Sequence, residues 1–151
     1  MNKFEKQLSA YAKRDEPVAV PAEVDWRDLE TYIGFQLPQD FKVFVAEAAD
    51  YYFEGEIPSG RNDDSSSYVG WLTIVMRERE QSENPIPRNL VPFCGVGNGD
   101  YHCFRILDRE TGSYDVVYWD HEIPTEQQSN RPQKLAKDFA EWIDGYVKDK
   151  F

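Results

Sequence analysis

The sequence predicts a single domain of the α+β class, with a mixed or mainly antiparallel twisted sheet packed against helices. Helical spacing dominates the first third of the chain, strand patterns follow up to residue 119, and helical spacing returns near the C-terminus. Helices and strands that are segregated along the chain, rather than alternating, are typical of this class. The 151 residues, 15% of them aromatic, supply the length and the apolar surface of one core.

A short amphipathic helix is expected first. Phe4, Leu8 and Tyr11 are spaced by four and three residues, and a proline-flanked linker follows them. We expect residues 1–20, this helix and linker, to pack on the domain formed by residues 21–151.

Two further helices are expected before residue 50. Trp26, Leu29 and Ile33 continue the helical period, and Gly34 is placed where a helix favours a left-handed residue just past its end. The next helix is expected to begin at Pro38. Its apolar positions share one face and are Phe41, Phe44, Val45 and Ala48.

Aromatic and β-branched residues predict strand-like segments at 51–56 and 68–76, separated by a polar loop. The charged residues 77–83 are then expected to form an exposed connection. Near the C-terminus, helical spacing returns after Pro132. The apolar positions of this last helix are Phe139, Trp142, Ile143 and Tyr146.

The segment from Pro92 to Glu122 has the most distinctive pattern of the chain. Its glycines resemble a phosphate-binding loop, but such a loop needs a following helix, and here a strand pattern follows. Asn98-Gly99 instead predicts a tight turn, because both residues tolerate a positive φ. Paired strands are expected at 101–106 and 116–119.

The same segment holds the candidate metal ligands of the chain, which are Cys94, His102, Cys103 and His121. His102 and Cys103 are adjacent in a predicted strand and therefore point to opposite faces, so they do not share one ion. We expect no metal and no other cofactor. The two cysteines are expected to be free, half-buried thiols.

Catalytic chemistry has one plausible base, His121, which lies between Asp120 and Glu122. The favoured interpretation of His121 is a strand-end residue whose ring binds a backbone carbonyl, so we do not expect an enzyme. A rival interpretation, a small-molecule or enzymatic role, requires Asp100, His102 and His121 to converge in one open cleft.

Charge narrows the class of partner. The chain has a net charge of −11, and residues 15–64 carry thirteen carboxylates against three cations. Such a field repels nucleic acids and anionic membranes and attracts basic proteins. No run approaches the ~20 apolar residues of a membrane-spanning helix, and the N-terminus lacks a signal peptide, so we expect a cytoplasmic protein. A monomer or weak dimer is expected.

Four blocks in this order, residues 33–44, 89–93, 97–104 and 116–122, resemble the SUKH superfamily, which includes fungal cell-wall synthesis regulators and many bacterial immunity proteins. The resemblance extends over residues 26–146. Its signature residues, expected to be structural, are Leu37, Pro38, Phe41, Phe44, Pro92, Phe93, Gly97, Asn98, Gly99, Asp100, Tyr101, Trp119, Asp120, His121 and Glu122.

The resemblance implies an immunity protein that binds a cognate toxin, often a nuclease, and blocks it without catalysis or a cofactor. The alternative is a regulatory scaffold of the cell-wall regulator type, with no toxin partner. We expect the toxin to contact exposed acids and aromatics of the middle region, because aromatic anchors with charged neighbours are typical of binding hot spots. These residues are Asp50, Tyr51, Tyr52, Glu54, Glu56, Asp63 and Asp64.

Overall fold

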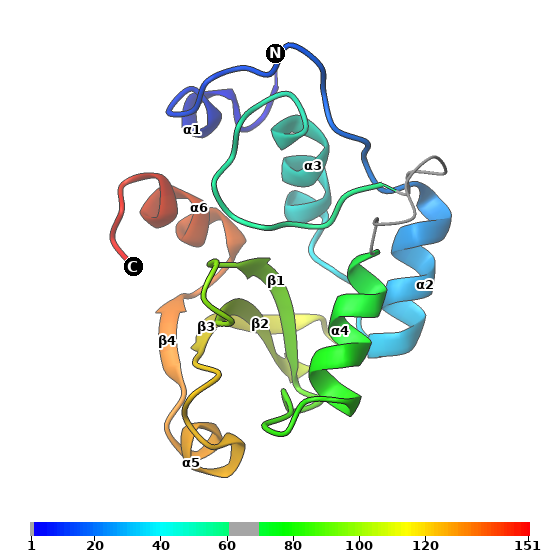
Figure 1. The fold of residues 1–151 in the computed structure, drawn as a ribbon, viewed down its shortest axis with the longest axis vertical. Coiled ribbons are helices and arrows are strands. Elements are labelled where there is room, and N and C mark those ends of the chain that lie inside the picture. Colours follow the sequence, from blue (N-terminus) through cyan, green and yellow to red (C-terminus); the bar gives the residue numbers. More distant parts are fainter. Residues whose placement is uncertain (1, 61–69) are drawn as a thin grey trace.

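The computed structural model describes residues 2–60 and 70–151, and Figure 1 shows the arrangement of their helices and strands. The α+β prediction is confirmed, because these residues form a single domain with one sheet and several helices. The elements in chain order are α1 (Glu5–Leu8), α2 (Glu23–Ile33), α3 (Gln39–Ala48), α4 (Trp71–Glu80), β1 (Leu90–Gly95), β2 (Tyr101–Asp108), β3 (Ser113–Trp119), α5 (Thr125–Asn130), β4 (Gln133–Ala136) and α6 (Phe139–Val147).

The sheet is an antiparallel meander in which β1, β2, β3 and β4 lie side by side in that order. In its central pair, Cys103 lies opposite Val117 and Phe104 opposite Val116. The paired strands predicted at 101–106 and 116–119 are therefore confirmed, and both extend further than expected.

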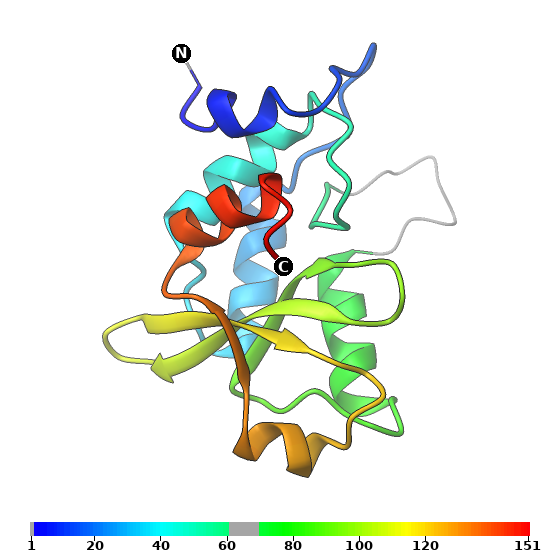
Figure 2. The ribbon, with the colours of Figure 1, turned by 90° about the vertical axis from the view of Figure 1, so that its left-hand side faces the viewer.

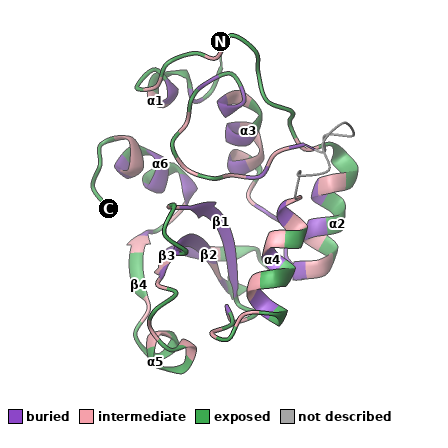
Figure 3. Cartoon of the chain, in the orientation of Figure 1, coloured by how far each residue is buried: buried purple, intermediate pink, exposed green. Residues whose placement is uncertain are grey.

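The helices cover the sheet unequally. Figure 2 shows α1, α3 and α6 stacked on one side of the sheet, with α5 on the other side. In Figure 1, α2 and α4 lie side by side next to β1. Figure 3 shows that β1 is buried along its whole length, so this edge of the sheet is an interior element.

The core is built around Phe41 of α3. Its ring makes edge contacts with Phe93 at 5.4 Å, Phe104 at 5.2 Å and Phe139 at 5.5 Å between ring centroids. Phe93 and Phe104 are stacked at 4.1 Å across β1 and β2. Edge-to-face and offset aromatic pairs are favourable beyond their area burial, so one helix residue ties two strands to α6.

Three predicted helices are confirmed with their buried faces. Gly34 ends α2 with a φ of 65°, and Pro38 lies just before the first residue of α3. The buried members of the predicted apolar faces are those of α2 (Trp26, Leu29, Ile33), α3 (Phe41, Phe44, Val45, Ala48) and α6 (Phe139, Trp142, Ile143). Tyr146, the fourth residue predicted for the face of α6, is only partly buried against the core.

The first helix is shorter than expected, because α1 ends at Leu8 and Tyr11 lies beyond it. Phe4 and Leu8 nevertheless belong to the main core. The ring of Phe4 lies 5.5 Å from that of Phe44 and 5.8 Å from that of Phe139. The start of the chain therefore packs between α3 and α6.

The prediction of a strand at residues 68–76 is wrong, because residues 71–76 belong to the helix α4. Residues 77–83 are likewise not simply an exposed connection, since α4 continues to Glu80 and Arg79 is buried. The strand-like segment 51–56 forms only single bridges, from Tyr51 to Lys13 and from Glu56 to Gly95. α5 and β4 were not predicted.

Within 2–60 and 70–151, every helix is too short or too polar to cross a bilayer.

Candidate functional site

Two groups of polar residues are candidates for function, and the first surrounds the turn between β1 and β2. The Val96 N–H donates to the Asp100 carbonyl at 3.2 Å, and the Asp100 N–H donates to Asn98 Oδ1 at 3.0 Å. The predicted tight turn is confirmed. Its positive φ angles lie at Gly97 (90°) and Gly99 (96°), not at Asn98 as expected. Asn98 contributes through its side chain instead.

Asp100 is the centre of this group and is only 5% exposed. Its Oδ1 accepts hydrogen bonds from the His121 backbone N–H at 2.9 Å and binds the His121 ring at Nδ1 over 2.6 Å. Its Oδ2 accepts the Tyr118 hydroxyl at 2.5 Å and the Asn98 amide at 3.3 Å. One carboxylate therefore joins the turn before β2 to the end of β3.

These contacts shift the pKa values of the group. Burial alone would raise the pKa of Asp100, but the hydrogen bonds from Tyr118 and His121 outweigh it and lower that pKa. The hydrogen bond to Asp100 raises the pKa of His121. Burial and then the hydrogen bond to Asp100 raise the pKa of Tyr118 to about 12. The arrangement favours an ionised Asp100 beside a protonated His121.

The interpretation of the His121 ring as a partner of a backbone carbonyl is wrong, because that ring binds the Asp100 carboxylate. Gly99 explains how the ring fits. A Cβ at position 99 would lie 3.0 Å from His121 Nδ1, so any larger residue would press on the imidazole and force it to shift.

His102 lies apart from this pair, in the aromatic core. Its Nδ1 accepts a hydrogen bond from Trp142 Nε1 at 2.8 Å, and burial lowers the pKa of His102 to about 4. Asp100 and His121 thus meet, whereas His102 is buried as a neutral core residue. The convergence that the enzymatic interpretation requires is not found among these three residues.

The cysteines are more buried than expected. Cys94 and Cys103 are free thiols with no exposed surface, rather than half-buried ones. Burial raises the pKa of each thiol, so both are protonated at neutral pH.

One set of possible metal ligands occurs in the described part of the chain. Single ligand atoms of Asp100, Asp120 and His121 lie within 4.8 Å of one another. Asp100 Oδ1 and His121 Nδ1 are already bonded to each other, so a cation would have to break that bond to use both. The positions of Asp100 and His121 therefore fit a hydrogen-bonded pair better than a metal site.

The second group is the acidic rim, which we define as the exposed side chains Asp50, Tyr52, Glu54 and Glu56. Exposed and inward-facing positions alternate here, because Phe53 and Ile57 pack against the core. Among the residues that the structure describes, none forms an ion pair with the three carboxylates of the rim. The carboxylates of the rim thus lack an ion-pair partner within the described residues, although the Arg14 guanidinium lies over the exposed ring of Tyr52.

Other predicted contact residues lie elsewhere. Tyr51 is 7% exposed and packs in the core, which differs from the exposed side chain that we expected. Asp63 and Asp64 lie outside the described residues. Backbone hydrogen bonds hold the rim against the linker, from Arg14 N to the Asp50 carbonyl at 2.8 Å and from Tyr52 N to the Ala12 carbonyl at 2.9 Å.

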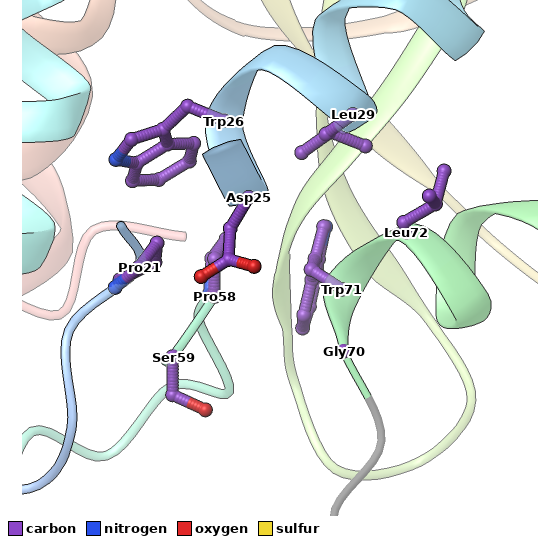
Figure 4. Close-up of a pocket in the computed structure, with 9 residues that line it drawn as sticks. All are labelled: Pro21, Asp25, Trp26, Leu29, Pro58, Ser59, Gly70, Trp71 and Leu72. Atoms are coloured by element: carbon purple, nitrogen blue, oxygen red, sulfur yellow. The ribbon is translucent and has the colours of Figure 1, made fainter. Parts of the chain in front are cut away.

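A groove that sequence reasoning missed lies next to the rim. It has a volume of about 280 Å³ and is bounded by the linker at Val18 and Ala19, the end of α3 at Ala49, and Ile57. No local pattern could reveal it, because its walls come from segments about 30 residues apart. A smaller pocket of about 30 Å³ lies between Trp26 and Trp71 (Figure 4), with room for one or two water molecules.

Comparison with known proteins places the chain in a family. The sequence model of the family SUKH_5, described as SMI1-KNR4 cell-wall, matches residues 1–148. The chain belongs to the SUKH family. The predicted resemblance is thereby confirmed, and the match includes the N-terminal helix and linker that lay outside it. The SUKH family includes toxin-immunity proteins.

A relative of this SUKH protein is found in Bacillus subtilis (strain 168). It is the SPbeta prophage-derived uncharacterized protein YokK, which is 23% identical over 145 residues, covering 78% of this chain and 70% of the relative.

Several residues of the predicted SUKH signature make contacts within the domain. Trp71 Nε1 donates to the Pro92 carbonyl at 2.7 Å, and the Asp120 carboxylate accepts the Glu122 N–H at 2.8 Å. Glu122 itself is exposed. The apolar members, buried in the core, are Leu37, Phe41, Phe44, Phe93, Tyr101 and Trp119.

Proposed function

We propose that this SUKH protein is an immunity protein that binds a cognate toxin and neutralises it through the acidic rim. The toxin would carry a basic surface, as a nuclease does where it holds phosphates. Neutralisation would take place in the cytoplasm by occlusion of that surface, with no reaction catalysed by the immunity protein.

The acidic rim is the observation that carries this proposal. Asp50, Glu54 and Glu56 are exposed within seven residues and have no ion-pair partner in the described parts of the chain. Uncompensated surface charge is poor at stabilising a fold but effective at attracting an opposite charge. The exposed ring of Tyr52 adds an aromatic contact of the kind that is enriched at hot spots.

Two features support binding over chemistry. The polar group around Asp100 uses its oxygens and the His121 ring in hydrogen bonds within the protein. The buried thiols of Cys94 and Cys103 have raised pKa values and are poor nucleophiles. Electrostatic complementarity, by contrast, gives a fast association rate and specificity without a catalytic group.

A toxicity rescue experiment tests the proposal. The products of genes beside this one are expressed singly in a bacterial host, with and without the immunity protein, and purified pairs are tested for complex formation. We expect one product to be toxic alone and harmless with this protein. If none of the neighbouring products is both toxic and neutralised, the proposal is wrong.

The alternative function is a regulatory interaction module without a toxin partner. The description of the matching family as a cell-wall family is the observation that favours it. The rescue experiment separates the two functions, because a regulatory module would bind host proteins and leave every toxin active.

A further inference from the structure

We propose that the groove beside the acidic rim receives a bulky apolar side chain from a basic segment of a partner protein. This inference rests on the proposed function in that the partner would be the toxin. It adds to that function the chemistry of the toxin segment, namely an aromatic or large aliphatic anchor flanked by lysine or arginine.

The size and lining of the groove fit such an anchor. Its volume of about 280 Å³ exceeds the roughly 150 Å³ of apolar cavities that bind a benzene molecule. Its walls include Val18, Val45, Ala49, Ile57 and Pro58, which are apolar. Val18 is 42% exposed, so apolar surface continues from the groove to the outside.

Backbone hydrogen bonds on both sides preform the groove. The Val18 N–H donates to the Ala49 carbonyl at 3.0 Å, and the Gly60 N–H donates to the Ala19 carbonyl at 2.9 Å. On the far wall, Glu56 and Gly95 exchange two hydrogen bonds of 3.0 Å and 2.7 Å. A preformed groove binds without the entropic cost of ordering its walls, which favours its use as a pocket for an anchor.

The charges around the groove select a basic segment. Glu56 lines the groove, and Asp50 and Glu54 belong to the same rim. Arg14 also lines the groove, but its Nε donates to the Tyr51 carbonyl at 3.0 Å, and its guanidinium lies 4.5 Å from the centre of the Tyr52 ring. Among the residues that the structure describes, the three carboxylates of the rim outnumber the one cation that lines the groove, so cations beside the anchor would meet a net negative charge.

A peptide titration followed by NMR tests the inference on the full chain. The probes are acetyl-Lys-Lys-Trp-Lys-Lys-amide, the same peptide with Glu in place of each Lys, and the same peptide with Gly in place of Trp. We expect the first probe to shift the amide signals of Val18, Gly55 and Ile57. The other two probes should bind at least about tenfold more weakly, because each lacks either the charge or the apolar anchor.

Two matched variants show whether the groove itself is used. Ala19→Trp places a large ring at an exposed residue that lines the groove, whereas Val24→Trp places it at an exposed residue of α2 that does not. Ala19→Trp should abolish the shifts caused by the first probe, and Val24→Trp should leave them unchanged.

The outcomes separate this inference from the proposed function. Equal binding of the three probes, shifts away from the groove, or unchanged binding to the Ala19→Trp variant would each overturn the inference. A toxin that is neutralised equally by wild-type protein and Ala19→Trp would keep the proposed function and remove the groove from it. Selective binding of the first probe without any neutralised toxin would support the groove as a binding site and overturn the proposed function.

Discussion

Asp100 shows how a single residue can account for a sequence signature. The turn residues before it carry positive φ angles, and the strand end after it supplies His121 and Tyr118 as hydrogen-bond donors. Burying a carboxylate is unfavourable unless it is hydrogen-bonded, and here both of its oxygens are. The glycines, the Asp and the His of the signature thus join the turn between β1 and β2 to the end of β3.

The contact between Gly99 and His121 gives a prediction at this scale. Gly97 and Gly99 both have positive φ, but a Cβ at position 97 would meet no atom within 4 Å, whereas one at position 99 would press on the His121 ring. We expect Gly99→Ala to lower the free energy of unfolding by about 1–3 kcal/mol more than Gly97→Ala does. Urea denaturation of both variants measures the difference, and equal losses would contradict the contact.

The two histidines of the chain should titrate in opposite directions from their ordinary pKa of 6.5. The hydrogen bond to Asp100 raises the pKa of His121, and burial lowers the pKa of His102 to about 4. An NMR titration of the two imidazole signals measures both values. Asp100→Asn should bring the pKa of His121 back toward 6.5, and a His121 pKa below 6.5 in the wild-type protein would contradict the pairing.

The same pair predicts how stability depends on pH. The pKa of His121 is raised on folding, so its contribution is complete below 6.5 and is lost as the pH rises through the raised value. The pKa of Asp100 is lowered, so its contribution is complete above 3.8 and is lost as the pH falls through the lowered value.

The stability difference between the wild-type protein and His121→Asn should therefore be largest between pH 4 and 6.5 and should shrink as the pH rises through the raised pKa of His121. Subtraction cancels the contribution of His102, which both proteins contain. Urea unfolding at a series of pH values tests this, and a difference that grows steadily with pH would rule the pair out.

At the scale of elements, α4 shows why a helix was mistaken for a strand. Thr73, Ile74 and Val75 form a β-branched run, which favours a strand by local preference. The buried positions of α4 are Trp71, Val75 and Arg79, spaced by four residues. Because Arg79 is charged, only two of these positions are apolar, and two positions do not reveal a helical period in the sequence.

Arg79 is buried, and its guanidinium donates hydrogen bonds to backbone carbonyls at the start of β1. Its Nη2 donates to the Arg88 carbonyl at 3.1 Å and to the Leu90 carbonyl at 2.8 Å. Arg79→Met should lower the free energy of unfolding by about 1–3 kcal/mol, because it removes both hydrogen bonds, one of which satisfies the buried Leu90 carbonyl. Arg77→Met, at an exposed position of the same helix, should change it by no more than about 0.5 kcal/mol. Equal stability of the two variants would contradict this role.

The remaining elements differ in how far local sequence determines them. α2, α3 and α6 were predicted because each has three or more apolar residues on one face. β4 was missed because its four residues, Gln-Lys-Leu-Ala, lack an alternating pattern. Pairing with β3, which sets Ala136 opposite Val116, determines this strand. Partners distant in sequence supply what the local pattern lacks.

At the scale of the whole molecule, part of the candidate site could be identified from the sequence and part only from the structure. The acids of the rim were identified from composition, since charge on a surface needs no partner in the fold. The burial of Tyr51 and the groove depend on contacts between the linker and residues 45–59, so they could be found only in three dimensions. Sequence therefore indicated the sign of the partner's charge, and the structure adds the shape of the surface that would bind it.

The association rate with the neutralised toxin tests the central claim most directly. One variant replaces Asp50, Glu54 and Glu56 by Lys and so removes the negative charge of the rim. A matched control places Lys at three exposed acids outside the rim, Glu83, Glu110 and Glu126, so that both variants have the same net charge. At low salt, the rim variant should associate at least about tenfold more slowly than the control, and the two rates should converge as salt screens the charges. Equal rates at low salt would contradict binding through the acidic rim.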